Sequence, residues 1–562
     1  MSALRDDPQL LKFIDATRQI VAVGSPFELR RENVLGQSMD VYRNRHPNLA
    51  ALVRSAARFG DREYLVTDDG RRLTFGDLPS AVARVAHGLQ CTHGIGKGDR
   101  VAIYAANCPE WILTFWACAV LGAQAVAMNG WWTGPEARLG LELTNPTLLV
   151  VDERRAERLG AEIPVPAIRI EDEFAALSEG TAPVDLPAAE VDEDDPVVLL
   201  FTSGTTGRPK AAVLTHRILI AFSMTQMMIG ARSRLLSNSP GHSSFVPVNL
   251  AVFPLFHVSG LLATAVSSLY SGQTNVWPLG RFDPKRVIEL TRAEGINLWV
   301  GGSTHIVRLL EHPDCAGIDP AQLRAVGIGG SASTPEIIRR IEERFPHLAN
   351  TVSSGYGSTE SGGMASSAPN FMLQVAPDCV GLPHPTIQAK IVDDEGNTLP
   401  DGHEGNIMLR SPMVMIEYFG HPEGNAEALT ADRWLRTGDY GRMEDGLLFL
   451  ASRRRDMIIR GGENIFPIEV ENCLESHPGV EEAAVFGIDD PTYGQIVHAV
   501  IVPRQGMTLD VAELERHCGS RIARYKVPAQ FEIMSDPLPR NATGKVVKAV
   551  LAGRSAAQFI EE

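Results

Sequence analysis

Three observations predict an α/β protein of at least two domains. At 562 residues the chain is too long for a single core. Between Asn48 and Asp152, segments with helical spacing alternate with short apolar runs, which is typical of a parallel α/β layer. In Ile387–Leu409, alternating segments flank the turn DDEGNTLPDG and indicate antiparallel strands of a small β-barrel-like unit. A second domain should begin within Ser452–Glu471, where a charged segment gives way to a new strand and helix.

Local signals justify the elements of the first half. Thr74 and Asp77 are residue types that begin helices, and Ala81–Leu89 has helical spacing before GKGDRVAIYAAN turns into a strand. The acidic, proline-rich segment 183–196 indicates a surface connection. Residues 1–45 carry a weak helical pattern followed by a polar stretch, and we assign them no chemistry.

Two uncharged stretches raise the question of a membrane span. Trp111–Met128 contains Gly122 midway and is better explained as a buried helix followed by a buried parallel strand. Val248–Tyr270 carries the polar residues Asn249 and His257. We therefore expect no membrane-spanning segment.

Charge and cysteine content narrow the function classes. A net charge of −16 disfavours a nucleic-acid partner, because a duplex binder needs a dominant basic face. Basic residues nevertheless cluster late in the chain, which suits a polyanionic small ligand. They are Arg453, Arg454, Arg455, Arg460, Arg516, Arg521, Arg524, Lys526, Arg540, Lys545 and Lys548. Seven cysteines without a CxxC pair, and no secretory leader, favour a reducing cytoplasm.

The stretch LLFTSGTTGRPKAAVLTH (Leu199–His216) has the character of a phosphate-binding loop. Apolar Val197–Phe201 should form a buried strand, and the hydroxyls and glycines that follow offer side-chain and backbone donors. The spacing differs from the P-loop GxxxxGK[ST]. A flexible linker is the alternative for such a composition, but the preceding strand and the following Lys210 favour a phosphate site.

Three further segments combine small, aromatic and polar residues. His257 lies in apolar VFPLFHVSG, where a lone histidine is more often structural than catalytic. VGIGGSAS (Val326–Ser333) ends a buried strand in small residues that let a flat ring lie against the backbone, and a tight βα turn would have the same pattern. SSGYGSTE (Ser353–Glu360) places an aromatic ring, a hydroxyl and a carboxylate in one loop.

Two motifs near the end of the chain each carry one charged residue of interest. RTGDYGRM places Asp439 at the tip of a turn, where acids are commonly caps, although a carboxylate also suits two ribose hydroxyls. LPRNATGKVVK places Lys545 after a turn glycine, where a lysine is ordinarily solvated.

As a whole, TSGTTGRPK resembles the signature of the AMP-forming adenylating superfamily, which includes acyl-CoA synthetases, adenylation domains of peptide synthetases and beetle luciferases. The other motifs follow in the order of that family from about residue 70 to 550. The resemblance implies a large N-terminal domain (1–454) of two parallel α/β layers plus a small β-barrel-like subdomain. A mobile α+β C-terminal domain (455–562) would be hinged to it at Arg455.

The resemblance also implies residue roles. The ATP-phosphate residues would be Thr202, Ser203, Gly204, Thr205, Thr206, Gly207, Lys210 and Thr359. The adenosine residues would be Gly330, Ser331, Ala332, Tyr356, Asp439 and Arg453. Glu360 would bind Mg²⁺, His257 would line the acyl pocket, Lys545 would act in adenylation, and Gly461 and Gly462 would line the coenzyme A channel. Ser452 and Gln495 depart from the family pattern only locally.

The function implied is an ATP-dependent acyl-CoA synthetase, which converts a carboxylic acid into an acyl adenylate and then into a coenzyme A thioester. Residues near the acyl site, His257, Val258, Gly260, Gly330, Gly355 and Met364, are apolar or small, which suits a fatty or ring-bearing acid. Expected partners are thus the acid, ATP and CoA, with neither nucleic acid nor membrane, in a cytoplasmic enzyme compatible with a homodimer.

Other functions share parts of this pattern. A luciferase-like oxygenase has every motif, and a stand-alone adenylation enzyme that loads a carrier protein also stays open. A peptide-synthetase module is weaker, because His257 stands where amino-acid users have an aspartate and about a dozen residues follow Lys548. A catalytically inactive nucleotide-binding protein is disfavoured, because Thr359, Glu360, Asp439 and Lys545 are all present.

Overall fold

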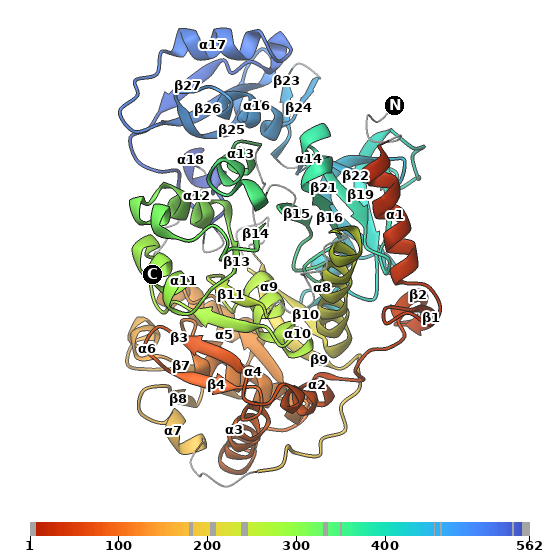
Figure 1. Cartoon of the computed structure of the whole chain (residues 1–562), viewed down its shortest axis with the longest axis vertical. Helices are drawn as coiled ribbons and strands as arrows, with labels where there is room; N and C mark the ends of the chain where they lie inside the picture. The colour runs from red at the N-terminus through yellow and green to blue at the C-terminus, as the bar shows by residue number, and fades with distance from the viewer. Residues whose placement is uncertain are drawn as a thin grey trace.

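The structure is a computed structural model of the chain, shown in Figure 1. It describes residues 7–178, 184–202, 209–237, 246–329, 335–348, 351–453, 456–460, 463–541 and 544–553. Within these residues it has two large sheets, helices packed on them, and a smaller sheet near the C-terminus. The α/β class and the two α/β layers expected from the sequence are confirmed.

The first sheet has the strand order β20-β10-β9-β6-β5-β7-β8 among the described residues. Its strands are β5 (Arg100–Tyr104), β6 (Gln124–Ala127), β7 (Leu148–Val151), β8 (Ala167–Arg169), β9 (Pro196–Thr202), β10 (Lys210–Thr215) and β20 (Glu417–Tyr418). The pairs from β8 to β9 are parallel, whereas β10 is antiparallel to both β9 and β20. Thr202, the first residue of the expected phosphate loop, therefore ends a central strand.

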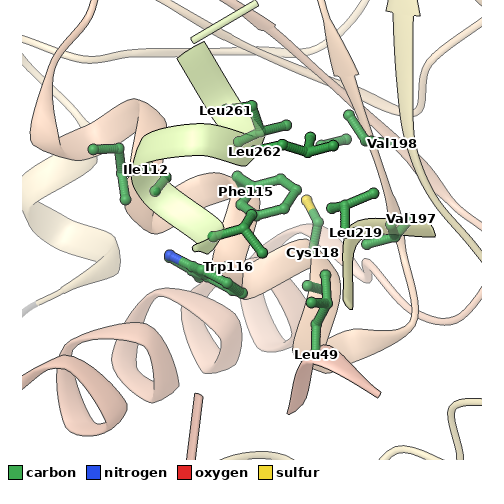
Figure 2. Packing of buried hydrophobic residues seen from close by; sticks show 14 of the residues in the cluster. Leu49, Ile112, Phe115, Trp116, Cys118, Val197, Val198, Leu219, Leu261 and Leu262 are labelled. Carbon is green, nitrogen blue, oxygen red and sulfur yellow. The ribbon is translucent and has the colours of Figure 1, made fainter. Parts of the chain in front are cut away.

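The helix that resembled a membrane span lies within a large cluster of buried apolar side chains. α4 (Pro109–Leu121) is followed directly by β6, as predicted, and Gly122 ends it with a φ of +72°. Figure 2 shows Phe115, Trp116 and Cys118 of α4 surrounded by side chains of other elements, such as Val198 and Leu262. α4 is apolar on all sides because it is buried on all sides. Among the described residues, no helix combines the length and hydropathy needed to cross a membrane.

The second sheet joins parallel and antiparallel parts in the order β18-β19-β21-β22-β17-β16-β15-β14-β13-β11-β12-β3-β4. Its parallel part comprises β3 (Glu63–Thr67), β11 (Val248–Ala251), β12 (Thr274–Trp277), β13 (Leu298–Gly301), β14 (Ala325–Ile328) and β15 (Ser353–Tyr356). The antiparallel strands are β4 (Arg72–Thr74), β16 (Ser366–Pro369), β17 (Cys379–Pro383), β18 (Gln388–Val392), β19 (Glu404–Arg410), β21 (Leu435–Glu444) and β22 (Leu447–Arg453).

The antiparallel strands predicted in Ile387–Leu409 are confirmed as β18 and β19. Their unit continues through β21, β22 and β17, and β17 pairs with β16 as well as β22. The unit is therefore an extension of the second sheet, and in the described part of the chain its ladder stays open at β18.

The N-terminal residues form α1 (Pro8–Ile20), capped by the Asp7 side chain, and a hairpin of β1 (Leu29–Val34) and β2 (Gln37–Tyr42). α1 packs on the long helix α8 (His216–Ser237). The hairpin was not predicted, because its strand β1 carries Arg30, Arg31 and Glu32 and lacks an apolar alternation.

The C-terminal part has a sheet and an apolar cluster of its own, at one end of the molecule (blue in Figure 1). Its strands are β23 (Ile458–Arg460), β24 (Glu463–Ile465), β25 (Val480–Asp490), β26 (Gly494–Pro503) and β27 (Gln530–Ile533). Its helices are α16 (Pro467–Glu475), α17 (Val511–Gly519) and α18 (Lys548–Leu551). The α+β composition agrees with the expectation for this part of the chain.

Candidate active site

One cavity of about 2510 Å³ collects predicted site residues from distant parts of the chain. Those that line it are Thr202, His257, Tyr356, Thr359, Glu360, Asp439 and Lys545. They come from the end of β9, the segment after β11, the loop after β15, β21, and the turn before α18. The cavity therefore extends over both large sheets and the C-terminal part, as a site for several substrates requires.

The loop after β15 holds Glu360 by folding back on itself. The N–H of Gly363 donates to the carbonyl of Ser358 (2.8 Å), and that of Ala365 donates to the carbonyl of Tyr356 (2.7 Å). Gly363 has a φ of +101°, and a Cβ there would lie 2.9 Å from the Phe222 ring, so the turn requires glycine. The loop is thus a compact turn that displays the carboxylate.

A tyrosine orients the Glu360 carboxylate. Tyr418 of β20 donates its hydroxyl to Oε1 of Glu360 at 2.8 Å. The N–H of Met415 also donates to the Glu360 carbonyl at 2.8 Å, so the segment before β20 fixes the backbone of the same residue. These contacts join the loop after β15 to the first sheet.

The residues around Glu360 fit a magnesium ion that arrives with a nucleotide. In the described ranges, no group of three or more His, Cys, Asp or Glu side chains could hold a metal ion by itself. Mg²⁺ is usually bound through one or two carboxylates together with phosphate oxygens and water. A single oriented carboxylate on the cavity wall matches that donor set.

Tyr356 and Asp439 form a second pair on the cavity wall. The Tyr356 hydroxyl donates to Oδ2 of Asp439 at 2.8 Å, and both residues are buried. The backbone of Asp439 pairs with Arg453 across β21 and β22, so the two residues that were predicted to contact ribose lie on adjacent strands.

The prediction that Asp439 lies at the tip of a turn was wrong. Asp439 lies inside β21, between Gly438, which has a φ of +74°, and a shift of register after Tyr440. The two glycines and the acid resembled a turn because this strand is bent locally.

His257 precedes the short helix α9 (Val258–Gly260), and its side chain is half-buried. Burial lowers the pKa of its imidazole to about 4, so the ring is neutral near pH 7. Its Nε2 has no hydrogen-bond partner among the described residues. Val258 and Met364 line the cavity with it, whereas Gly260 packs tightly against the Pro254 carbonyl. This wall is apolar with one neutral polar atom.

Lys545 reaches the cavity from a tight turn. The N–H of Lys545 donates to Oδ1 of Asn541 (3.0 Å), and the N–H of Asn541 donates to the Lys545 carbonyl (2.9 Å). Gly544 has a φ of +80° and lies beside Thr304 of α12 (Ser303–Glu311). The C-terminal part thus contacts the second sheet's helices where its lysine lines the cavity.

Lys210 was predicted to contact phosphate, but its ammonium is not on the cavity wall. Its Nζ lies 3.7 Å from Oε2 of Glu427 and 5.1 Å from the centroid of the Tyr418 ring. It therefore lies beside the ring of the tyrosine that orients Glu360.

Several predicted residues lie outside the described residues. They are Ser203, Gly204, Thr205, Thr206, Gly207, Gly330, Ser331, Ala332, Arg455, Gly461 and Gly462, together with the side chain of Arg453. Their assigned roles stay predictions.

Sequence reasoning missed Tyr418 and Asn249, which also belong to this site. Tyr418 lies in IEYFG, a segment without a recognisable signal. For Asn249 the sequence did contain a signal, because it is a polar residue inside the apolar run VNLAVF. Asn275 interrupts the run TNVW in the same way. The two asparagines are paired in the β11–β12 register.

Comparisons with known proteins agree with this geometry. Residues 52–419, more than half of the chain, match the family described as AMP-binding enzyme, and residues 469–545 match its C-terminal domain. The chain is 32% identical to a fatty acid–[acyl-carrier-protein] ligase, ScoC, of Streptomyces coeruleorubidus over 91% of this chain and 97% of that protein. It is 33% identical to a feruloyl-CoA synthase of an Amycolatopsis species over 89% and 97% of the two chains.

A solved structure is also similar. It is O-succinylbenzoate coenzyme A synthetase (MenE) of Bacillus subtilis in complex with ATP and magnesium ion, with a TM-score of 0.74 and 29% identity, covering 89% of this chain and 98% of that one. The family match extends over the loop of Glu360, and its C-terminal part includes Lys545. The chain belongs to the AMP-binding enzyme family and is an adenylate-forming acyl-CoA ligase.

Proposed function

We propose that this ligase activates an apolar acid, fatty or ring-bearing, with Mg²⁺ bound through Glu360. The observation that carries the proposal is the single cavity lined by Glu360, Asp439, His257 and Lys545. A metal carboxylate, a ribose acceptor, an acyl wall and a mobile cation are the four parts that adenylate formation needs.

The acyl wall supports an uncharged substrate body. His257 is neutral near pH 7, and Val258 and Met364 beside it are apolar. A second carboxylate or an ammonium placed against this wall would lose hydration without gaining an opposite charge. The proposed substrate therefore carries one carboxylate, which reacts, and an apolar chain or ring next to it.

In the first half-reaction, a carboxylate oxygen of the acid bonds to the α-phosphorus of ATP. The bond from that phosphorus to the bridging oxygen breaks, and pyrophosphate leaves. Lys545 would stabilise the negative charge that accumulates at the α-phosphate, together with the loop 202–210 and Thr359. Tyr418 holds the Glu360 carboxylate in place. Bound magnesium would supply positive charge to the phosphate oxygens.

In the second half-reaction, the thiol of coenzyme A attacks the acyl carbon, AMP leaves, and the thiol proton is released. We infer that the C-terminal domain, residues 455–562, turns about Arg455 between the two steps, so that Lys545 withdraws and Gly461 and Gly462 border the thiol's path. The family resemblance supports this inference, as does the position of Lys545 in a part of the chain with its own core.

A pyrophosphate-release screen tests the proposed substrate class. Acetate, medium- and long-chain fatty acids, aryl acids, steroid side-chain acids and free amino acids are compared with Mg²⁺, ATP and CoA present. We expect fatty or ring-bearing acids to give the highest kcat/KM. Preference for acetate or for an amino acid would contradict the apolar-acid proposal.

A further inference from the structure

The wall of the cavity changes from apolar to polar along its length. His257 and Val258 begin one side, which continues through α9 and the π-helical segment η3 (Leu261–Val266) to Ser267. Ala263, Thr264 and Ser267 all line the same cavity. At helical rise the ten steps from His257 to Ser267 span on the order of 10–15 Å. The polar end thus lies about one medium-sized acyl group away from His257.

The opposite side of this polar end is formed by strands β11 and β12. Asn249 of β11 and Gln273, just before β12, line the cavity. Asn249 is two residues from the end of β11, about 7 Å below the strand end that leads to His257. The asparagine is therefore at the depth of the cavity and not at the reaction centre.

A chain of amide hydrogen bonds determines the orientation of the Asn249 side-chain amide, that is, the positions of its oxygen and its nitrogen. Nδ2 of Asn275 donates to the carbonyl of Thr264, and this carbonyl can only accept. Oδ1 of Asn275 then accepts from Nε2 of Gln273 (3.2 Å) and from Nδ2 of Asn249 (3.1 Å). The remaining atom, Oδ1 of Asn249, is therefore an acceptor.

That acceptor has no partner. Asn249 is only 2% exposed, and its Oδ1 makes no hydrogen bond to any residue that the structure describes. Leaving a buried acceptor unsatisfied is costly, and native proteins pair nearly all such atoms. Asn249 is one of the residues that line the cavity, so a donor on the molecule that fills the cavity is the partner that this enclosed oxygen lacks.

We propose that Asn249 binds a hydrogen-bond donor at the far end of the acyl substrate. The substrate class is then a carboxylic acid with an apolar body and a distal hydroxyl, such as an ω-hydroxy fatty acid or a para-hydroxyaryl acid. This inference rests on the proposed function, because it assigns the polar end of the same acyl cavity. It adds a specificity residue that takes no part in the chemistry.

The test compares acids that differ only at the far end. Matched sets carry a terminal hydroxyl, a methoxy group or hydrogen: medium- and long-chain ω-substituted fatty acids, and para-substituted phenylpropanoates. kcat/KM is measured by pyrophosphate release for each. At the length that fits, the hydroxy acid should exceed both the methoxy and the unsubstituted acid by about 10- to 100-fold, because only the hydroxyl donates to Oδ1.

Asn249→Leu should remove this preference. Its kcat/KM for the hydroxy acid should fall about 10- to 100-fold, while that for the unsubstituted acid stays equal or rises. Asn370→Leu is the matched control. Asn370 is also a buried asparagine, 1% exposed, and its amide donates to Glu342, but it is not on the cavity wall. It should keep the wild-type preference.

Each outcome decides between the accounts. If the wild-type enzyme activates unsubstituted or methoxy acids as well as hydroxy acids at every length, solvent satisfies Oδ1 and the proposal is wrong, while the ligase function stands. This comparison of acids uses only the wild-type enzyme, so it tests the proposal even if Asn249→Leu does not fold. A hydroxyl preference that survives in Asn249→Leu would also overturn it. If no fatty or aryl acid supports pyrophosphate release, the proposed function itself is wrong, and the hydroxyl preference is then not the reason.

Discussion

Among single residues, Glu360 matters most for the proposed Mg²⁺ site, together with the residues that hold its carboxylate. Tyr418 donates to Oε1 from a different sheet, so the carboxylate keeps its orientation before any nucleotide arrives. A preorganised ligand loses little entropy when it binds, which is why a single carboxylate can suffice for a metal that also contacts phosphate.

Glu360→Gln should lower the rate of adenylation by at least about 10²-fold and leave the fold intact. The amide oxygen can still accept from Tyr418, so the structural contact is retained while the negative charge is lost. Magnesium-dependent pyrophosphate release and thermal unfolding are measured together. Tyr418→Phe is the control, since it removes the hydrogen bond and keeps the negative charge of Glu360. This variant should lower the rate of adenylation by about tenfold or less. Full activity of Glu360→Gln would show that Glu360 is not the Mg²⁺ ligand.

Among the secondary-structure elements, local sequence patterns predicted the regular helices and strands but not the strands that contain a bend. The order of α4 and β6 was predictable, because an apolar run with a glycine near its middle indicates a buried helix that ends at the glycine and a buried strand after it. The position of Asp439 inside β21 was not, because Gly438 and a register shift make a bent strand resemble a turn. The Tyr418–Glu360 contact joins residues 58 apart, and nothing in either local sequence signals it.

Gly260→Ala should destabilise the segment that carries His257. A Cβ there would overlap the carbonyl oxygen of Pro254, which is backbone and cannot move aside. We expect the free energy of unfolding to fall by about 1–3 kcal/mol, with a higher KM for the acid. Gly230→Ala in α8 is the control, because its Cβ would meet only the Arg234 side chain at 3.7 Å. It should be neutral or stabilise by up to about 1 kcal/mol. Equal stability of the two variants in denaturant unfolding would contradict the packing argument.

Two buried histidines, His216 and His384, and two half-buried ones, His257 and His305, make the stability of the whole molecule depend on pH. Burial lowers the pKa of His216, His257 and His305 to about 4, and that of His384 to about 3. The unfolded chain binds these protons at its ordinary pKa of about 6.5, whereas the folded chain does not, so stability falls as pH decreases from about 6.5 toward 4.

Denaturation midpoints should therefore drop steeply between pH 7.5 and about pH 5. His384→Leu should flatten this dependence, because both ring nitrogens of His384 lack partners among the described residues and the leucine cannot be protonated. The measurement is a series of urea titrations across this pH range for both proteins. Identical slopes would show that His384 is not held neutral in the fold.

The arrangement of the two domains predicts which half-reaction depends on Lys545. In this structure Lys545 lines the cavity with Glu360, which is the arrangement that the proposed adenylation step needs. Lys545→Ala should slow adenylate formation by roughly 10²- to 10³-fold and spare thioester formation from preformed acyl adenylate. Lys548→Ala is the matched control: Lys548 lines the same cavity but pairs with Glu471 at 2.6 Å, and its loss should change neither step by more than a few-fold. Equal loss of both half-reactions in Lys545→Ala would contradict domain alternation.

Product stoichiometry shows whether the reaction passes through an acyl adenylate. The enzyme is mixed with its best acid and Mg²⁺-ATP, first without and then with CoA, and the nucleotides and acyl products are quantified. Without CoA, acyl-AMP and pyrophosphate should accumulate together up to the enzyme concentration. With CoA, AMP, pyrophosphate and acyl-CoA should form in equal amounts. Formation of ADP and phosphate, or of acyl-CoA with no acyl-AMP on the enzyme, would contradict the account.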